Sequence, residues 1–323
     1  MKAVVYDRPG ASADVLRVVD VPRPEPGPGE VRVRVSFSGV NPTDWKSRSG
    51  ATARPVDEFQ IPHQDGSGVI DAVGPGVDED RVGQRVWVWM AAAGSRWGTA
   101  AEWTVVSDQQ AVALPAAASL ELGASLGVPA VTAHRCLFAD GDLAGRTVLV
   151  AGGAGAVGHF AIQLARHAGA RVVTTVSGAA KAELARAAGA DLVVNYREPD
   201  ALERIRAFTE RVDRVVEVNL AANLNLDLGL SGPGTVVSVY AADTADPELP
   251  LRACMRANVV LRFVLLYGVP IADLLRGVTA VSAALEAGAF TELPVHRFPL
   301  EECAAAHDAV QSGAVGKVLL DVG

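Results

Sequence analysis

The chain of 323 residues has few cysteines and no long hydrophobic run. Cys136, Cys254 and Cys303 lie far apart and form no CxxC pair, so the sequence shows no metal-ligand cluster and is typical of a reducing compartment. We interpret all three as buried small hydrophobic residues. No apolar stretch approaches the roughly 20 residues of a membrane span, and the N-terminus becomes polar too early for a signal peptide. We therefore predict a cytoplasmic protein without a membrane segment.

The chain also has no excess of positive charge. Its 29 Lys and Arg residues against 37 Asp and Glu residues give a formal net charge of −8. No basic cluster with interleaved aromatic residues is present, so we expect no nucleic-acid partner. Half of the residues are apolar, and this length suggests about two domains, each with its own core.

The first third of the sequence is typical of β structure. Residues 31–37, VRVRVSF, alternate valine with arginine, which predicts a half-buried strand. The proline-rich stretch 21–30 before it cannot pair in a sheet and is expected to be a connector. Short strands and glycine turns follow, which indicates an antiparallel, barrel-like domain. We assign residues 1–119 to it, completed by a returning tail, residues 269–323.

From about residue 120, apolar strands and amphipathic helices alternate strictly. That order predicts a parallel sheet covered on both faces, which we place at residues 120–268. The first predicted strand, RTVLVAGG (146–153), leads into a glycine turn and a helix with His159 and Gln163 on its polar face. The overall expectation is an α/β protein of two domains.

The glycine turn, VLVAGGAGAVG (148–158), carries the first chemical signal. Gly153, Gly155 and Gly158 have the GxGxxG spacing, which lets a backbone approach a pyrophosphate at the start of a helix. The motif follows a strand and opens a helix, as a dinucleotide site requires. The alternative is an ordinary tight turn between a strand and a helix.

The second signal is a missing acid. Residues 174–181, TTVSGAAK, end the next predicted strand, where an NAD site usually places Asp or Glu on the ribose hydroxyls. Ser177 and Lys181 offer instead a hydroxyl and a positive charge, which suit a 2′-phosphate. The cofactor prediction is therefore NADPH; the alternative for Lys181 is a solvated surface lysine.

Several segments together resemble the medium-chain dehydrogenase/reductase superfamily, and within it the zinc-free quinone oxidoreductase (zeta-crystallin-like) family. These segments are SGVNPTDWKSRSG (38–50), GSGVIDAVGPGV (66–77), AGGAGAVGHFAIQLARHAGARV (151–172), VVNYRE (193–198) and FPLEECAAAHDAVQSGAVGKVLL (298–320). The resemblance covers nearly the whole chain. It implies a GroES-like β-barrel catalytic domain and a Rossmann doubly wound parallel-sheet domain that binds NADPH.

The resemblance also implies the absence of a metal. Zinc-dependent relatives have a catalytic cysteine where this chain has Asn41, and a GHE segment where it has PHQD (62–65). We read His63 as structural or pocket-lining, since a single histidine cannot form a zinc site.

Family positions carry over where the residues match. The resemblance places Asn41 and, with less support, Lys46 in the substrate cleft; relatives have a tyrosine where Lys46 stands, and the alternative is a surface lysine. For Asn223 the alternative is a helix N-cap, and for residues 263–265 it is a core or dimer strand. The implied cofactor contacts are Asn41, Thr132, Gly152, Gly155, Ala156, Val157, Gly158, Ser177, Lys181, Tyr196, Asn223, Tyr240, Phe263, Val264 and Leu265.

The resemblance implies an NADPH-dependent quinone reductase whose hydride passes to a small quinone or electron-poor enone. A 2-alkenal or enoyl reductase remains an alternative. So does a non-catalytic NADPH-binding protein that binds RNA or has a structural role. The segment NVVLRFVLLYG (258–268) matches the last Rossmann strand, which in relatives pairs with its twofold mate. We therefore expect a homodimer.

Overall fold

The alternating valines of residues 31–37 lie in an interior strand of a mostly antiparallel sheet. The computed structural model describes residues 1–52, 56–242 and 247–323. Val31, Val33 and Val35 are almost fully buried, as the alternation predicts. Arg32, on the opposite face, is also buried, because it pairs with Asp71 and Glu25.

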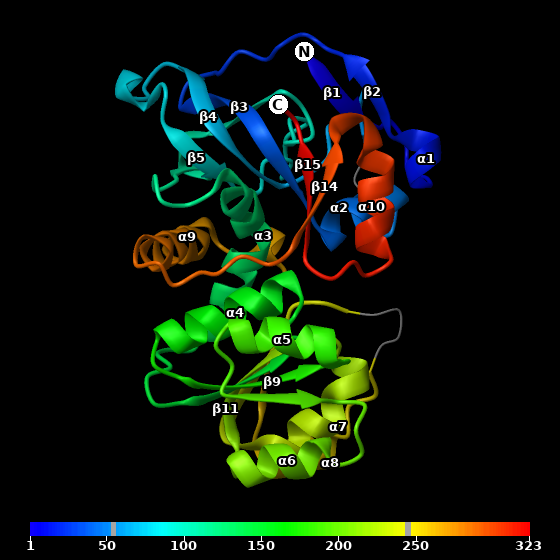
Figure 1. Ribbon diagram of the computed structural model, residues 1–323, viewed down its shortest axis with the longest axis vertical. Coiled ribbons are helices and arrows are strands. Elements are labelled where there is room, and N and C mark those ends of the chain that lie inside the picture. Colours follow the sequence, from blue (N-terminus) through cyan, green and yellow to red (C-terminus); the bar gives the residue numbers. More distant parts are fainter. Residues whose placement is uncertain (53–55, 243–246) are drawn as a thin grey trace. The chain divides into compact units, whose positions relative to one another are not determined.

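The described residues form two units, and the first comprises Met1–Val128 and Pro294–Gly323 (Figure 1). Its largest sheet has the order β14-β15-β3-β4-β5-β7, with β6 also paired to β3, so the C-terminal strands complete the N-terminal sheet. This return of the tail was expected. The strands are β1 (Lys2–Val5), β2 (Arg17–Asp20), β3 (Glu30–Val40), β4 (Asp65–Val73), β5 (Arg85–Val88), β6 (Trp103–Ser107), β7 (Ala111–Ala113), β14 (Val295–Pro299) and β15 (Lys317–Asp321). The helices are α1 (Ser12–Val15), α2 (Pro42–Ser49) and α10 (Cys303–Gln311), with short 3₁₀ turns at Glu79–Arg81, Asp108–Gln110 and Leu300–Glu302.

The second unit, Pro129–Leu293, contains a six-stranded parallel sheet of order β10-β9-β8-β11-β12-β13. Helices α4 and α5 cover one face and α6 and α7 the other (Figure 1). Its strands are β8 (Thr147–Ala151), β9 (Arg171–Val176), β10 (Leu192–Asn195), β11 (Val212–Glu217), β12 (Ser231–Val239) and β13 (Val260–Phe263). Its helices are α4 (Ala156–His167), α5 (Ala179–Ala187), α6 (Ala201–Phe208), α7 (Leu220–Leu230), α8 (Leu251–Ala257) and α9 (Ile271–Glu286), with a 3₁₀ turn at Leu266–Gly268. The predicted doubly wound α/β fold is confirmed.

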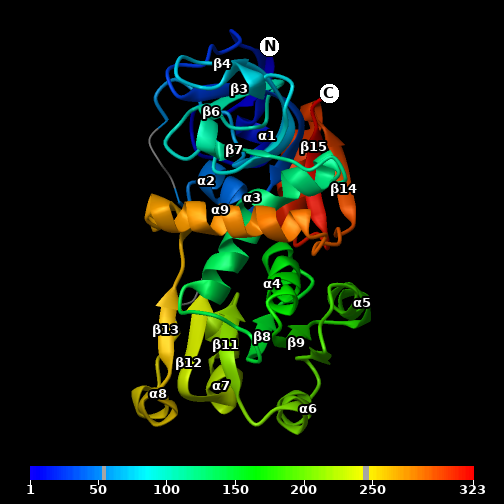
Figure 2. The same ribbon diagram turned by 90° about the vertical axis from the view of Figure 1, so that its left-hand side faces the viewer.

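Strand β13 lies at one outer edge of the parallel sheet (Figure 2). It is shorter than the expected strand at 258–268, because Asn258 is the left-handed C-cap of α8 and a 3₁₀ turn begins at Leu266. Its register pairs Val260 with Val236 and Phe263 with Val239. The other side of the strand has no neighbouring strand within the sheet order of the described residues.

The chain passes from the first unit to the second inside helix α3 (Leu120–Phe138), between Val128 and Pro129, and not at the expected residue 119. Helix α9 was expected to belong with the tail, but it groups with the second unit. The reason is local packing: Arg135 of α3 donates a 2.9 Å hydrogen bond to Asp273 of α9. A Cβ atom on Gly277 of α9 would lie 3.2 Å from His134 of α3, so the two helices approach closely.

The polar face expected on α4 is covered. His159 and Gln163 are both nearly fully buried, because the segment after α9 lies against them. His159 Nε2 contacts the carbonyl oxygen of Thr291 at 3.1 Å, and Gln163 Oε1 accepts hydrogen bonds from Thr291. Within the residues that the structure describes, no helix is both long and apolar enough to cross a bilayer.

Candidate dinucleotide and substrate site

The glycine turn connects β8 to α4 and is held by strand β9. The N–H groups of Gly152 and Gly153 donate to the carbonyl oxygen of Thr175 at 3.0 and 3.2 Å. Gly152 has φ of 72°, a conformation that residues with a Cβ rarely adopt. A Cβ atom on Gly158 would lie 2.3 Å from the carbonyl oxygen of Gly152, so the helix approaches the turn as closely as glycine allows.

The first amide groups of α4 are open to a ligand. Gly155 is the N-cap residue and contributes no side-chain cap. The bond from His159 N–H to Gly155 O, 2.8 Å long, begins the helical pattern. Among the described residues, the N–H groups of Ala156, Val157 and Gly158 therefore have no partner within the helix. A Cβ on Gly155 would meet only Gly152 O, at 3.4 Å. The turn therefore has the geometry that binds a phosphate group.

Three further predicted contacts gather at the carboxyl ends of neighbouring strands. Ser177 follows β9, Tyr196 follows β10, and the Tyr196 N–H donates to Val176 O at 3.1 Å across the two strands. Lys181 lies in the first turn of α5. Among the described residues, neither the Ser177 hydroxyl nor the Lys181 ammonium has a hydrogen-bond or ion-pair partner. Both groups are therefore available to an anion.

Arg197 adds a positive charge at this edge that the sequence analysis did not include. It is exposed, and its guanidinium lies 5.9 Å from the centre of the Tyr196 ring. Its position directly after Tyr196, in VVNYRE, was the available signal.

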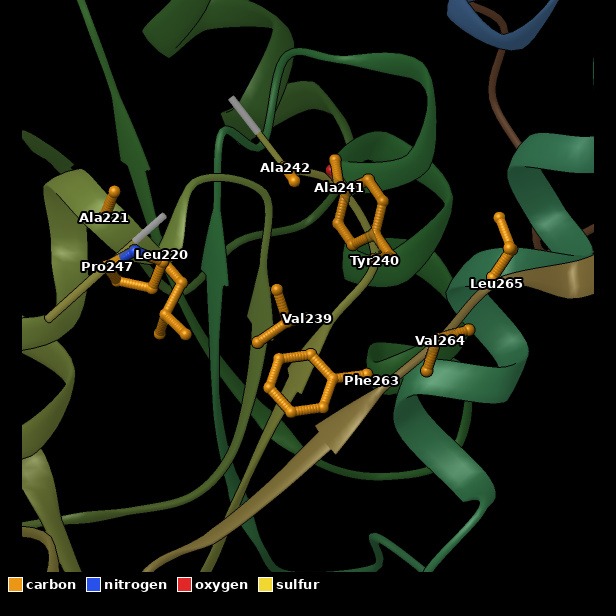
Figure 3. A pocket seen from close by; sticks show the side chains of 10 residues that line it. All are labelled: Leu220, Ala221, Val239, Tyr240, Ala241, Ala242, Pro247, Phe263, Val264 and Leu265. Atoms are coloured by element: carbon orange, nitrogen blue, oxygen red, sulfur yellow. The ribbon is translucent and has the colours of Figure 1, made fainter. Parts of the chain in front are cut away.

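A pocket of about 450 Å³ lies at the ends of β12 and β13 (Figure 3). The structure brings four of the predicted contacts together in its lining: Tyr240, Phe263, Val264 and Leu265. Phe263 is 71% exposed and Val264 only 7% exposed, so Phe263 offers its side chain while Val264 packs inward. The pocket lining is otherwise almost wholly apolar, which suits a flat ring system.

Asn223 lies in the first half of α7, one turn beyond the helix start. The alternative N-cap role is wrong, because Asn219 caps this helix by accepting from the Ala222 N–H at 3.2 Å. The Asn223 side-chain amide donates to Glu217 Oε1 at 2.8 Å. Burial raises the pKa of Glu217 and raises that of the neighbouring Asp227 well above its usual range. Asn223 thus donates to one oxygen of a buried carboxyl group at the end of β11.

In the first unit, Asn41 is held in a buried polar cluster. Lys317 Nζ donates to Asn41 Oδ1 at 2.7 Å, and Asn41 Nδ2 donates to Asp65 Oδ2 at 2.6 Å. The Asn41 N–H donates to Asp44 Oδ2 at 2.7 Å. All four residues are at most 4% exposed. The amide of Asn41 is therefore fixed in orientation, and the contact with Asp65 uses one of its two hydrogens.

The cluster has two carboxyl groups and one ammonium group. Burial raises the pKa of Asp65 to about 6, against the opposing charge of Lys317. Burial, together with the charge of Asp65, raises the pKa of Asp44 well above its usual range, and burial lowers the pKa of Lys317. Asp65 and Lys317 therefore form the charge-balancing pair, with the Asn41 amide between them. The sequence signal for Lys317 was a lone lysine in the apolar strand KVLL.

The other two predicted contacts lie apart from these clusters. Thr132 is on α3, is 6% exposed and belongs to the second unit with the glycine turn. Lys46 is on α2 in the first unit, half-buried, with its ammonium 5.8 Å from the centre of the Trp45 ring. This contact accounts for the side-chain position of Lys46 without an ion pair.

Replacing Lys317 with methionine should strongly destabilise the first unit. The change leaves the carboxylate of Asp65 buried without its counter-charge and Asn41 Oδ1 without its donor, which costs about 3–5 kcal/mol. The matched control is Lys2→Met, which removes a lysine paired on the surface with Glu301 and should cost less than about 1 kcal/mol. Urea unfolding of the two variants measures the difference. Equal stabilities would show that the buried cluster contributes no more than a surface pair.

Two family profiles match the chain. The alcohol dehydrogenase GroES-like domain matches residues 27–116, and the zinc-binding dehydrogenase family matches residues 156–282. The quinone oxidoreductase of Homo sapiens is 31% identical over 327 residues, which cover 99% of this chain and 97% of that protein. The quinone oxidoreductase of Pongo abelii is 31% identical, covering 88% of this chain and 87% of that protein.

Solved structures agree over the full length. An NAD-dependent alcohol dehydrogenase is 29% identical, with a TM-score of 0.90 and complete coverage of both chains. A mycobacterial quinone oxidoreductase is 31% identical, with a TM-score of 0.85 and 99% coverage of both chains. A mycobacterial protein solved in complex with NADPH is 30% identical, with the same TM-score and coverage.

The residues at the position of the catalytic zinc in zinc-dependent relatives do not fit that ion. Zinc sites use thiolate, imidazole and carboxylate ligands. Here Asn41 Oδ1 already accepts from an ammonium group, which would repel a second cation. The oxygens of Asp65 accept from Asn41 Nδ2 and from the Val128 N–H, at 2.6 and 2.8 Å.

The fold, the glycine turn and the full-length matches agree with one another. The match at residues 27–116 falls within the first unit, and the match at residues 156–282 falls within the second. The chain therefore belongs to the medium-chain dehydrogenase/reductase superfamily and, within it, to the quinone oxidoreductase (zeta-crystallin-like) family.

Proposed function

We propose that the protein is an NADPH-dependent reductase that transfers a hydride to quinones or related electron-poor enones without a metal. The single observation that carries the cofactor choice is the edge formed by Ser177 and Lys181. A hydroxyl and an ammonium group, both without partners among the described residues, stand where an NAD site has an acid. The NADPH complex of the 30% identical mycobacterial protein supports the same choice.

When bound, NADPH supplies the hydride that reduces the acceptor. The residues of this chain then bind the two reactants, orient them and exclude water. In this proposal the amides of Ala156 and Val157 hold the pyrophosphate, and the apolar pocket beside Tyr240 and Phe263 receives a flat part of the cofactor. The protein contributes chiefly the positioning of the two reactants, which accounts for much of the rate in such reactions.

On the acceptor side, we propose that Asn41 directs its second amide hydrogen to the acceptor or cofactor. Lys317 and Asp65 fix that orientation. We assign no general acid, because a hydroquinone anion can take its proton from solvent. Lys46 keeps its proposed place in the substrate cleft, where its positive charge would attract an anionic acceptor; contact with Trp45 is the competing explanation for its position.

The test of this function is the initial rate of NADPH oxidation and of NADH oxidation, with a small quinone and a small enone as separate acceptors. We expect quinone turnover with a clear preference for NADPH. Turnover of the enone alone would place the protein with the 2-alkenal or enoyl reductases. Tight NADPH binding without turnover would instead support the non-catalytic alternative, and a gel-shift series at several salt concentrations would then test RNA binding.

The variant Lys181→Ala should change the KM for NADPH but not the KM for NADH. Loss of one charged contact to the 2′-phosphate should raise the KM for NADPH by about tenfold, while the KM for NADH stays unchanged. Arg186→Ala is the matched control, because it removes a positive charge from the same helix, where Arg186 pairs with Glu183. Equal effects of the two variants on the KM for NADPH would contradict a specific role for Lys181.

We also propose a homodimer formed through the edge of β13. Seven large apolar side chains between residues 249 and 271 are at least 42% exposed, which is unusual for one region of a soluble surface. They are Leu249, Leu251, Met255, Val260, Phe263, Leu265 and Ile271. An apolar edge strand without a neighbour favours pairing with a second copy.

The variant Val260→Arg should dissociate this dimer. Val260 is 45% exposed on β13, and arginine there would place like charges on both copies along their shared edge. Sedimentation velocity should give a dimer for the unmodified protein and a monomer for the variant. Val82→Arg, at a 50% exposed position in the first unit, should remain dimeric. A monomeric unmodified protein at micromolar concentration would contradict the proposal.

A further inference from the structure

Three residues that are far apart in the sequence meet inside the first unit. His63, Cys303 and His307 are each at most 2% exposed, and their ligand atoms all lie within 4.8 Å of one another. His63 Nε2 is 2.9 Å from His307 Nε2 and 3.8 Å from Cys303 Sγ. From the sequence alone, Cys303 is interpreted as a buried small hydrophobic residue and His63 as a structural or pocket-lining histidine. The fold instead places them together with a second histidine.

Two features of the backbone favour this arrangement: helix α10 and the conformation of His63. Cys303 and His307 are four residues apart on α10, so both side chains lie on one face of that helix. His63 has φ of 78°, an uncommon conformation for a residue with a side chain. Its carbonyl oxygen accepts from the Thr99 N–H, which holds it there. Strained residues of this kind concentrate at functional positions.

A chain of hydrogen bonds determines which nitrogen of His63 carries the proton. Thr99 Oγ1 donates to the carbonyl oxygen of Asp65 at 2.5 Å. Ser38 Oγ, 2.7 Å from Thr99 Oγ1, must therefore donate to it. That leaves Ser38 Oγ as the acceptor for His63 Nδ1–H, at 2.8 Å. His63 Nε2 is therefore the unprotonated nitrogen, and its lone pair accepts the 2.9 Å hydrogen bond from His307 Nε2–H, with Cys303 Sγ 3.8 Å away.

This is the arrangement of a histidine that binds a metal. Metal-ligating histidines commonly anchor their other ring nitrogen in a hydrogen bond, which fixes the tautomer. Two of the three distances also fit. With metal–nitrogen and metal–sulfur bonds of about 2.0 and 2.3 Å, ligand atoms of one site lie roughly 3 to 4 Å apart. His63 Nε2 lies 2.9 Å from His307 Nε2 and 3.8 Å from Cys303 Sγ, and the Cys303–His307 pair lies within 4.8 Å. His307 Nδ1 is buried and has no hydrogen-bond partner among the described residues, so the ring of His307 is held through Nε2 alone.

We propose that His63, Cys303 and His307 form a binding site for a single Cu(I) ion. A thiolate and two imidazoles are the soft and borderline ligands that Cu(I) accepts. One thiolate neutralises a monovalent ion, and a neutral complex is tolerated in a buried site. Zn(II) would leave a net positive charge and lack a fourth ligand. The guanidinium of Arg48, whose charge acts on Cys303 and His307, adds to that penalty.

The binding step involves no change of oxidation state. The Cys303 S–H bond breaks and its proton leaves, while a copper–sulfur bond and two copper–nitrogen bonds form. The proton on His307 Nε2 moves to Nδ1 of the same ring. One proton is therefore released for each Cu(I) bound. The ion would link α10 to the segment before β4, and so stabilise the first unit.

The test is an anaerobic titration of the reduced, full-length protein with Cu(I) held by bicinchoninate. The unmodified protein should remove one equivalent of Cu(I) from the coloured complex. Cys303→Ser should weaken this binding by at least about tenfold, whereas Cys254→Ser, a change at a half-buried cysteine of the second unit, should leave it unchanged. No uptake by the unmodified protein, or equal uptake by the Cys303→Ser variant, would overturn the proposal.

Two further measurements keep the test decisive if Cys303→Ser does not fold. X-ray absorption of the copper-loaded unmodified protein should give one sulfur and two nitrogen ligands, and a sulfur-only site would refute the assignment. Ser38→Ala removes the acceptor of His63 Nδ1–H but replaces none of the three ligands, and it should weaken Cu(I) binding. Zn(II) bound in preference to Cu(I), in a manner that depends on Cys303, would overturn the choice of metal.

Discussion

The close approach of α4 to the end of β8 is the constraint on which the dinucleotide site depends. Gly158 lies so near the carbonyl oxygen of Gly152 that a Cβ atom there would come within 2.3 Å of it. This contact, with the left-handed conformation of Gly152, directs the first amides of the helix outward at the carboxyl edge of the sheet. The parallel strand order then brings the ends of β9 and β10 to the same edge.

The first unit depends on a different interaction, the buried contact between Lys317 and Asn41. It joins the last strand of the chain to the residue before α2, so the tail completes both the sheet and the polar cluster. The same ammonium group occupies the side-chain oxygen of Asn41, one of the residues that we propose to lie in the substrate cleft. A single lysine in strand β15 thus both anchors the returning tail and fixes the side chain to which we assign a role in the proposed metal-free chemistry.

Much of the candidate cofactor site could be proposed from the sequence because its parts are local. The glycine turn, Ser177 and Tyr196 each follow a strand directly, and Lys181 lies in the first turn of the helix after β9. Strand ends in a parallel sheet converge by geometry. The burial of polar side chains on strand and helix faces was less predictable. Arg32 is buried against Asp71 and Glu25, and His159 is covered by the segment of Thr291, which is distant in the sequence. Asn223 was assigned by resemblance, and its contact with Glu217 depends on how α7 packs against β11.

The sequence by itself determined the two-domain α/β order, the open glycine turn and the absence of an acid after β9, since periodicity and short-range spacing encode all three. Only the tertiary structure decided which distant side chains share a buried site. Lys317 reaches Asn41 across 276 positions, and His307 reaches His63 across 244. Such contacts have no local signature, because they arise when α10 and β15 return to a sheet built from the beginning of the chain.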